Sequence, residues 1–133
     1  MTGYNNENGI VKMDNQAMVS IIDRSYLNDI QPCKPIWITS LAGKTKYTED
    51  GIFGNLPFRV YAGNKGTPNI LSQDAMEKCF SIKYVKGQYY QVFDKEVSYI
   101  FRKNNRVYIS QIDYFINQVN LNITELISNS NQL

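Results

Sequence analysis

Residues 81–109 alternate runs of aromatic and β-branched residues with turn formers, a pattern typical of strands joined by tight turns. The runs are Ile82–Val85, Gln88–Phe93, Val97–Phe101 and Arg106–Ile109. Gly87 and Asn105 fall in two of the gaps, and both residue types tolerate the positive φ that tight hairpins need. Because the connections are short, the sequence predicts four antiparallel strands.

The segment that follows has the pattern of an amphipathic helix. Its apolar residues recur at intervals of three and four, which places them on one helix face: Ile112, Phe115, Ile116, Val119, Ile123, Leu126 and Ile127. Ser110 and Asp113 have the spacing of a capping box, in which each side chain binds the other's free backbone N–H. We therefore expect a C-terminal helix that covers one face of the meander.

The first half of the chain is less regular. Residues 1–13 are polar and contain two glycines, so they are predicted to be a flexible N-terminal arm. A helix is predicted from Asp14 to about Asp29, with Ala17, Met18, Ile21, Ile22, Ser25 and Ile30 on its inner face. Further predicted elements are strands at Ile36–Leu41 and Phe58–Ala62 and a helix from Ser72 to Phe80.

Together these elements predict one small α+β domain over residues 14–133. It would pack an antiparallel sheet of about four to six strands with two or three helices. The length of 133 residues favours one domain, and 43% hydrophobic against 20% charged residues allows a core. The sequence has no run of 18 apolar residues and no basic, apolar start. We therefore expect no membrane contact, no secretory signal and a cytoplasmic location.

Candidate catalytic chemistry is sparse. The chain has no histidine, the commonest general base and metal ligand. Cys33 and Cys79 are far apart and belong to no pair motif, so we expect reduced thiols, with Cys79 on a buried helix face. The closest carboxylates, Glu49 with Asp50 and Asp94 with Glu96, fall in predicted turns, where acidic side chains are usually solvated. The sequence thus predicts no catalytic site, metal site or cofactor.

The predicted meander is basic as well as aromatic, since residues 81–108 hold six Lys and Arg against two Asp and Glu. Aromatic faces can stack on bases while cations hold phosphates. The candidate binding residues are Lys83, Lys86, Tyr89, Tyr90, Arg102, Lys103 and Arg106. In the alternative interpretation, one sheet face is core and the basic residues only cover turns and edges.

The chain contains 10 tyrosines, more than a small core easily hides, because each hydroxyl needs a partner. Tyrosine is enriched at protein interfaces, which favours a protein partner or a homo-oligomer. Abundant Asn, Ile, Lys and Tyr are associated with AT-rich genomes, including those of many phages. Our hypothesis is a non-enzymatic protein-interaction or assembly protein, phage- or virus-encoded, acting in the host cytoplasm or the virion. The alternative is a nucleic-acid-binding module that uses residues 81–108.

Overall fold

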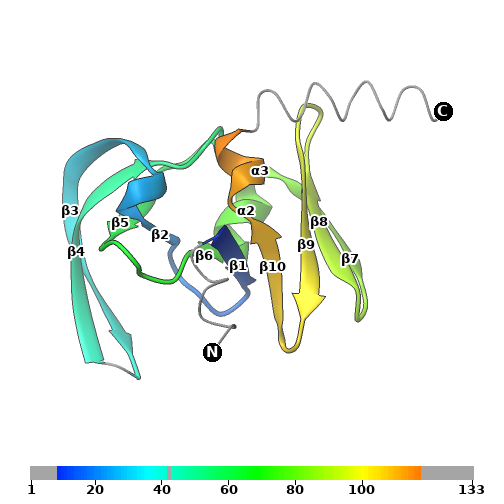
Figure 1. The fold of residues 1–133 in the computed structure, drawn as a ribbon, viewed down its shortest axis with the longest axis horizontal. Coiled ribbons are helices and arrows are strands. Elements are labelled where there is room, and N and C mark those ends of the chain that lie inside the picture. Colours follow the sequence, from blue (N-terminus) through cyan, green and yellow to red (C-terminus); the bar gives the residue numbers. More distant parts are fainter. Residues whose placement is uncertain (1–8, 42, 118–133) are drawn as a thin grey trace.

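The computed structural model describes residues 9–41 and 43–117, which form one ten-stranded sheet with two short α-helices (Figure 1). The strands are β1 (Ile10–Asp14), β2 (Ile21–Asp23), β3 (Asn28–Ser40), β4 (Gly43–Ile52), β5 (Val60–Gly63), β6 (Ile70–Ser72), β7 (Ser81–Val85), β8 (Tyr89–Phe93), β9 (Ser98–Asn104) and β10 (Val107–Gln111). The helices are α2 (Gln73–Cys79), α3 (Asp113–Ile116) and the 3₁₀-helix η2 (Arg24–Tyr26).

The strand order is β3-β4-β5-β2-β6-β1-β10-β9-β8-β7. Strand β1 runs parallel to β6 and β2 runs parallel to β5, whereas the other neighbours are antiparallel. The middle of the sheet therefore consists of three short strands, β2, β6 and β1, of which β6 is distant in sequence from the other two. It joins two antiparallel ribbons, β3–β4–β5 and β7–β10, at its two ends.

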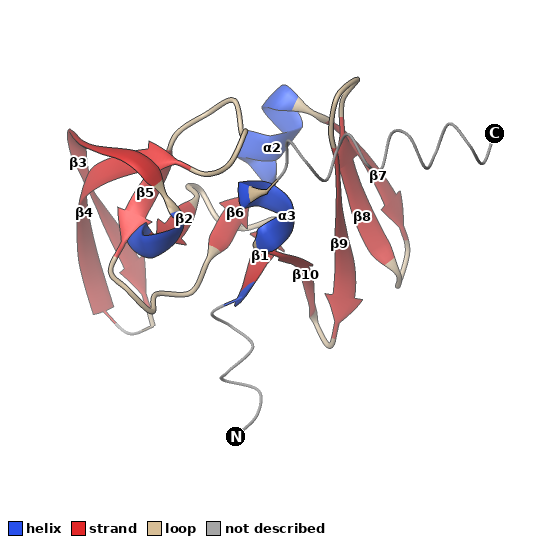
Figure 2. Ribbon diagram, turned by 45° about the horizontal axis from the view of Figure 1, so that its top comes forward, coloured by secondary structure: helices blue, strands red, loops and turns tan. Residues whose placement is uncertain are grey.

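Both views place the β3–β4 hairpin and the β7–β8 hairpin on opposite sides of the molecule (Figures 1 and 2). Helices α2 and α3 lie between these hairpins, next to the central strands. Helix α2 follows β6 directly, and Ser72 caps it by accepting a hydrogen bond from the Ala75 N–H at 3.3 Å.

Phe115 of α3 lies at the centre of the aromatic core. Its ring stacks on Tyr99 of β9 with centroids 4.2 Å apart and on Phe53, which follows β4, at 5.0 Å. Phe101 contacts the same ring at 6.0 Å. These four side chains are all buried. One residue of a four-residue helix therefore packs the two halves of the sheet against each other, which fits the large apolar area that aromatic rings bury.

The predicted α+β fold with about four to six strands is wrong. The described chain is mostly β, with 56% strand and 14% helix in a single ten-stranded mixed sheet. The error in the predicted fold arises chiefly in the first half of the chain, where short apolar runs fit a helix or a strand equally well. Pairing with strands that are distant in sequence determines that these runs form strands.

The helix predicted from Asp14 to Asp29 is one such error. Ile21 and Ile22 are buried, as expected, but they lie in β2 between β5 and β6. Met18, assigned to the inner face, is 90% exposed. The predicted flexible arm also includes residues of β1, in which Val11 and Met13 are buried; residues 1–8 lie outside the described chain.

The predicted capping box at the C-terminal helix is also wrong. Ser110 belongs to β10, where it pairs with Val11 of β1, and it is buried. Ile112 is the N-cap of α3 and no side chain caps the helix. Ile112 and Phe115 are buried as predicted, while Ile116 is exposed. The remaining apolar residues of the predicted face, from Val119 onward, lie outside the described residues.

The predictions that depend on turn-forming and helix-capping residues are confirmed. The four meander strands correspond to β7–β10, and they pair as antiparallel neighbours. Gly87 and Asn105 have φ of 75° and 59°, as the tight turns require. The strands predicted around residues 36–41 and 58–62 overlap β3 and β5, and the helix capped by Ser72 is α2.

Candidate interaction site

The β3–β4 hairpin extends beyond the body of the sheet as a two-stranded arm, which we define as residues 36–47 (Figure 1). Within it, pairing runs from Ile36 with Tyr47 to Ser40 with Gly43. Strand β5 pairs with β4 only at Asp50 and Gly51, outside the arm. The arm therefore pairs with no third strand, and only Tyr47 at its base contacts a ring of β5, that of Tyr61 at 6.3 Å. Two-stranded ribbons with little further packing are only marginally stable in water.

The arm carries large apolar side chains into solvent. Trp37 is 60% exposed and Leu41, at the tip, is fully exposed. The Lys46 ammonium lies 5.8 Å from the centroid of the Trp37 ring, a cation–π geometry. An exposed tryptophan beside lysine combines apolar area with positive charge at one place on the surface.

The base of the arm is held by charged groups. Arg59 binds the Asp50 carboxylate through Nε at 2.6 Å and the Asp29 carboxylate through Nη1 at 3.2 Å. Arg24 binds Glu49 at 2.7 Å. These contacts tie β3 and β4 to the loop before β5 and to η2, so the arm is anchored where it leaves the sheet.

The outer edge of the arm is open. Strand β3 is an edge strand, and open edges can pair with strands of another chain. Pro32 and Pro35 interrupt this edge near the base, because proline has no N–H to donate. The register of β3 against β4 also shifts there, between Pro32 and Ile36. Between Ile36 and Ser40 no proline or register shift blocks the edge.

The candidate binding residues of the meander do not form one surface. The pairing of β8 with β9 puts Tyr89 and Arg102 on one sheet face and Tyr90 with Phe101 on the other. By alternation, Lys103 shares the face of Tyr90. Lys83 belongs to the face of Tyr89, while Lys86 and Arg106 lie in the two turns. A single flat surface of all seven residues is therefore excluded.

Tyr90 instead belongs to a cluster of three tyrosines with Tyr84 and Tyr108. Their ring centroids lie 4.6 Å apart for Tyr84–Tyr90 and 4.7 Å for Tyr90–Tyr108. A hydrogen bond from Tyr108, together with the charges of Lys103 and Lys86, lowers the pKa of Tyr84 below its ordinary 10.0. The cluster thus accounts for three of the tyrosines by packing, with Tyr84 still exposed.

Three basic residues of the meander, Lys86, Lys103 and Arg106, share one end of the molecule. Figures 1 and 2 show the β7–β8 turn, the β9–β10 turn and the tip of the β3–β4 arm on the same side. Lys86 lies in the first turn, Lys103 and Arg106 lie at the second, and Lys44 and Lys46 lie in the arm. All five side chains are exposed. Asp94 and Glu96 lie in the β8–β9 turn at the opposite end of these strands.

Three of the four carboxylates singled out from the sequence, Glu49, Asp50 and Asp94, have structural partners. Glu49 and Asp50 bind the two arginines at the base of the arm. Asp94 accepts hydrogen bonds from the backbone N–H groups of Glu96 and Val97 at 2.8 and 2.9 Å, which closes the β8–β9 turn. Across residues 9–41 and 43–117, no three His, Cys, Asp or Glu side chains gather as metal ligands.

The two cysteines are free. Cys33 is half-buried in β3, where burial and the Asp50 carboxylate raise the pKa of its thiol. Cys79 is exposed at the end of α2, so its predicted place on a buried helix face is wrong. The buried residues Met76, in the middle of α2, and Phe80, which follows it, supply the apolar contact of this segment instead.

Comparison with known proteins identifies no relative. The sequence matches no protein-family model, no curated protein and no solved structure. No helix in the described part of the chain is long and apolar enough to cross a membrane. The function therefore has to be argued from the geometry of this chain.

Proposed function

We propose that this chain is a non-enzymatic protein-interaction or assembly protein, and that its β3–β4 arm makes the contact. The observation that carries the proposal is the exposure of Trp37 and Leu41 on a ribbon that pairs with no third strand. Tryptophan is the residue type most enriched among the side chains that dominate binding energy at protein interfaces. A partner that covers the arm would bury this area and stabilise the ribbon.

Charge supports a particular kind of partner. Lys34, Lys44 and Lys46 are exposed on β3 and β4, and no carboxylate in the described residues forms an ion pair with them. Complementary potentials steer association and select partners. The partner surface would therefore be an apolar groove with an acidic rim, on another protein or on a second copy of the chain.

The proposal is tested with Trp37→Ala, measured by sedimentation velocity at high concentration and by affinity capture from the native lysate. We expect this variant to lose self-association or the captured partner, with a loss of about 2 kcal/mol or more in binding free energy. Met18→Ala is the control, because Met18 is also highly exposed but lies outside the arm. Equal association and capture by wild type and Trp37→Ala would contradict the proposal.

Nucleic-acid binding is a second candidate function, favoured by the gathering of basic turns on one side of the molecule (Figure 2). Phosphate contacts at several cations would make binding fall steeply with salt. The test is fluorescence anisotropy of labelled single- and double-stranded oligonucleotides at low and physiological salt. A variant with Arg102, Lys103 and Arg106 changed to alanine should bind more weakly and with a flatter salt dependence. Unchanged oligonucleotide binding in this variant would show that these three meander residues do not contact the nucleic acid.

A further inference from the structure

Backbone groups at several places in the sheet have no strand beside them. Strands β3 and β7 are the end strands, and the arm opens another edge along β4, because β5 pairs only with Asp50 and Gly51. A fork inside the sheet is a further place: β9 and β10 pair from Arg102 with Ile109 toward their turn and diverge on the other side. Open edges can pair with strands of other chains, so proteins usually protect them.

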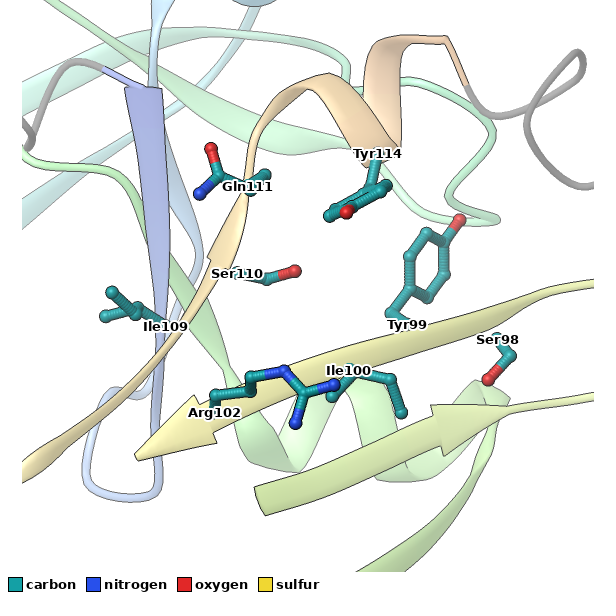
Figure 3. Close-up of a pocket in the computed structure, with 8 residues that line it drawn as sticks. All are labelled: Ser98, Tyr99, Ile100, Arg102, Ile109, Ser110, Gln111 and Tyr114. Carbon is teal, nitrogen blue, oxygen red and sulfur yellow. The ribbon is translucent and has the colours of Figure 1, made fainter. Parts of the chain in front are cut away.

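The fork is closed to a further strand. A cavity of about 370 Å³ lies between the diverging strands, lined by residues of β9 and β10 and by Tyr114 (Figure 3). Figure 3 shows the Tyr114 side chain of α3 beside this cavity, and α3 follows β10 directly. A helix therefore occupies the end at which the two strands part, so the fork is not an edge to which another chain could add a strand.

Two of the open edges carry lysine. Lys83 is exposed in the middle of β7, and Lys44 and Lys46 are exposed along the β4 side of the arm. A lysine on an edge strand opposes pairing, because a second strand would bury its charge or bring a like charge against it. These two edges are therefore protected in the usual way.

The β3 edge of the arm lacks such protection. Residues 36–41 read Ile-Trp-Ile-Thr-Ser-Leu, with no charged residue, proline or glycine. β-Branched and aromatic residues favour strands, and uncharged segments of this kind are the ones that pair between chains. Lysine and proline occur in β3 only near the base, at Pro32, Lys34 and Pro35. The unprotected edge is thus one short, uncharged segment.

The hairpin geometry determines which backbone groups face this edge. Ser40 pairs with Gly43 across a two-residue turn, and the closing pair of such a hairpin exchanges both of its hydrogen bonds. By alternation Ile38 also bonds to β4, whereas the N–H and C=O groups of Trp37 and Thr39 point to the open edge. No strand of the described chain lies on that side of these two residues.

We propose that two copies of the chain pair through this edge, antiparallel and about a two-fold axis at Ile38. The proposal rests on the interaction function proposed for the arm and specifies a second copy as the partner. Trp37 lies opposite Thr39 of the second copy, so both residues exchange N–H···O=C hydrogen bonds across the contact. Ile38 lies opposite its own counterpart, a β-branched pair of the kind that stabilises sheets.

The proline at the base selects this register. If Trp37 lay opposite Trp37 of the second copy, Thr39 would face Pro35, which has no N–H to donate. If Thr39 lay opposite its own counterpart, Trp37 would face Leu41, which lies in the turn beyond the strand. The register centred on Ile38 is therefore the one that pairs every outward backbone group of Trp37 and Thr39.

The contact closes on itself and is small. Once two β3 edges have paired, the open edges that remain in the described sheet carry lysine, so a dimer forms rather than a filament. A ladder of this length buries less than the about 1,200 Å² of stable interfaces, which indicates a dimer that dissociates on dilution. The side-chain face with Trp37 and Lys46 is not used by the backbone ladder, so it remains available to an acid-rimmed groove.

Cysteine cross-linking at high protein concentration tests the register. In a Cys33→Ser and Cys79→Ser background, Ile38→Cys places two thiols in a directly opposite pair with Cα atoms about 4.5 Å apart, within the range of a disulfide. Ile36→Cys is the matched control, because Ile36 lies opposite Ser40 of the second copy and the two thiols are about 13 Å apart along the ladder. Oxidised glutathione should convert Ile38→Cys, and not Ile36→Cys, into a covalent dimer on a non-reducing gel. Equal cross-linking of both variants, or of neither, would overturn the proposal.

A backbone variant separates the edge contact from the side chains of the arm. Thr39→Pro removes an N–H from the open edge, whereas Thr39→Ala keeps this N–H and is the matched control. In sedimentation velocity, Thr39→Pro should raise the dimer dissociation constant about tenfold or more, because one hydrogen bond is lost from each copy, and Thr39→Ala should not.

The outcomes distinguish this pairing from the function proposed for the arm. Self-association that Thr39→Pro leaves intact would overturn the pairing. A monomeric wild type whose capture of another protein still depends on Trp37 would also overturn the pairing and leave the function of the arm standing. Association that neither Trp37→Ala nor Thr39→Pro weakens would contradict both.

Discussion

Gly54 packs directly against the backbone of Phe115. A Cβ at Gly54 would lie 2.7 Å from the Phe115 carbonyl carbon and closer still to its oxygen. Gly54 also has φ of +57°, which side chains rarely adopt. This contact brings the loop after β4 against α3, next to the stacked rings of Phe53 and Phe115. The aromatic core therefore depends on a glycine at this position.

Gly54→Ala should lower the free energy of unfolding by more than about 3 kcal/mol, because it adds a backbone clash to the strain of a positive φ. Gly87→Ala is the control, since Gly87 has φ of +75° but nothing within 4 Å of the added Cβ. That variant should lose only about 1–2 kcal/mol. Urea denaturation measures both. Equal losses of unfolding free energy in the two variants would show that a Cβ at Gly54 does not clash with the Phe115 backbone.

Asp23 joins β2 to the loop before β6. Its carboxylate accepts hydrogen bonds from the Ser25 N–H at 2.8 Å, the Ser25 hydroxyl at 2.7 Å and the Gly66 N–H at 2.7 Å. Burial alone would raise the pKa of this carboxyl, but the hydrogen bonds from Gly66 and Ser25 outweigh it and hold the pKa below 3.8. The ionised form is therefore favoured by folding.

Asp23→Asn should destabilise the protein by about 2 kcal/mol at neutral pH, since hydrogen bonds to a charged acceptor are replaced by weaker ones. A group with a lowered folded pKa stabilises the fold above its unfolded pKa, and this contribution is lost as pH falls through the folded value. The difference in unfolding free energy between wild type and variant should therefore narrow below about pH 4. If the difference in unfolding free energy between wild type and Asp23→Asn stays constant as the pH falls, the lowered pKa of Asp23 is contradicted.

The tyrosine cluster predicts a specific titration. Tyr108→Phe removes the hydrogen bond to the Tyr84 oxygen that favours its ionised form, so the pKa of Tyr84 should rise. The ¹³Cζ chemical shift of Tyr84 during an alkaline titration measures this change. Tyr89→Phe is the control, because Tyr89 lies on the opposite sheet face. An unchanged Tyr84 pKa in Tyr108→Phe would exclude this hydrogen bond.

The two cysteines should differ in reactivity. Iodoacetamide at pH 8 should modify exposed Cys79 about tenfold faster than Cys33, whose half-buried thiol has a raised pKa beside Asp50. Peptide mass spectrometry over time distinguishes the two sites. The control is the same reaction in denaturant, where the rates should converge. Similar rates in the native protein would mean that the base of the arm opens readily.

The sequence by itself determined the parts of the fold that local signals specify. The turns at Gly87 and Asn105 and the aromatic runs beside them predict β7–β10, because hairpin pairing depends on neighbouring residues. The same holds for Ser72, whose cap depends on an N–H three residues away. The basic character of this meander was also evident, although the faces that its side chains occupy were not.

Tertiary structure alone decided the rest. Strands β1, β2 and β6 are three to five residues long and exist because distant segments pair with them. Ile21 therefore fitted a helical pattern that was wrong, and Val11 fell in a segment predicted to be a flexible arm. Ser110 looked like a helix cap because its spacing to Asp113 is right, but pairing with β1 placed it in a strand. The exposed arm and the β9–β10 fork likewise arise where pairing stops, and hydrogen bonding between remote strands determines where that happens.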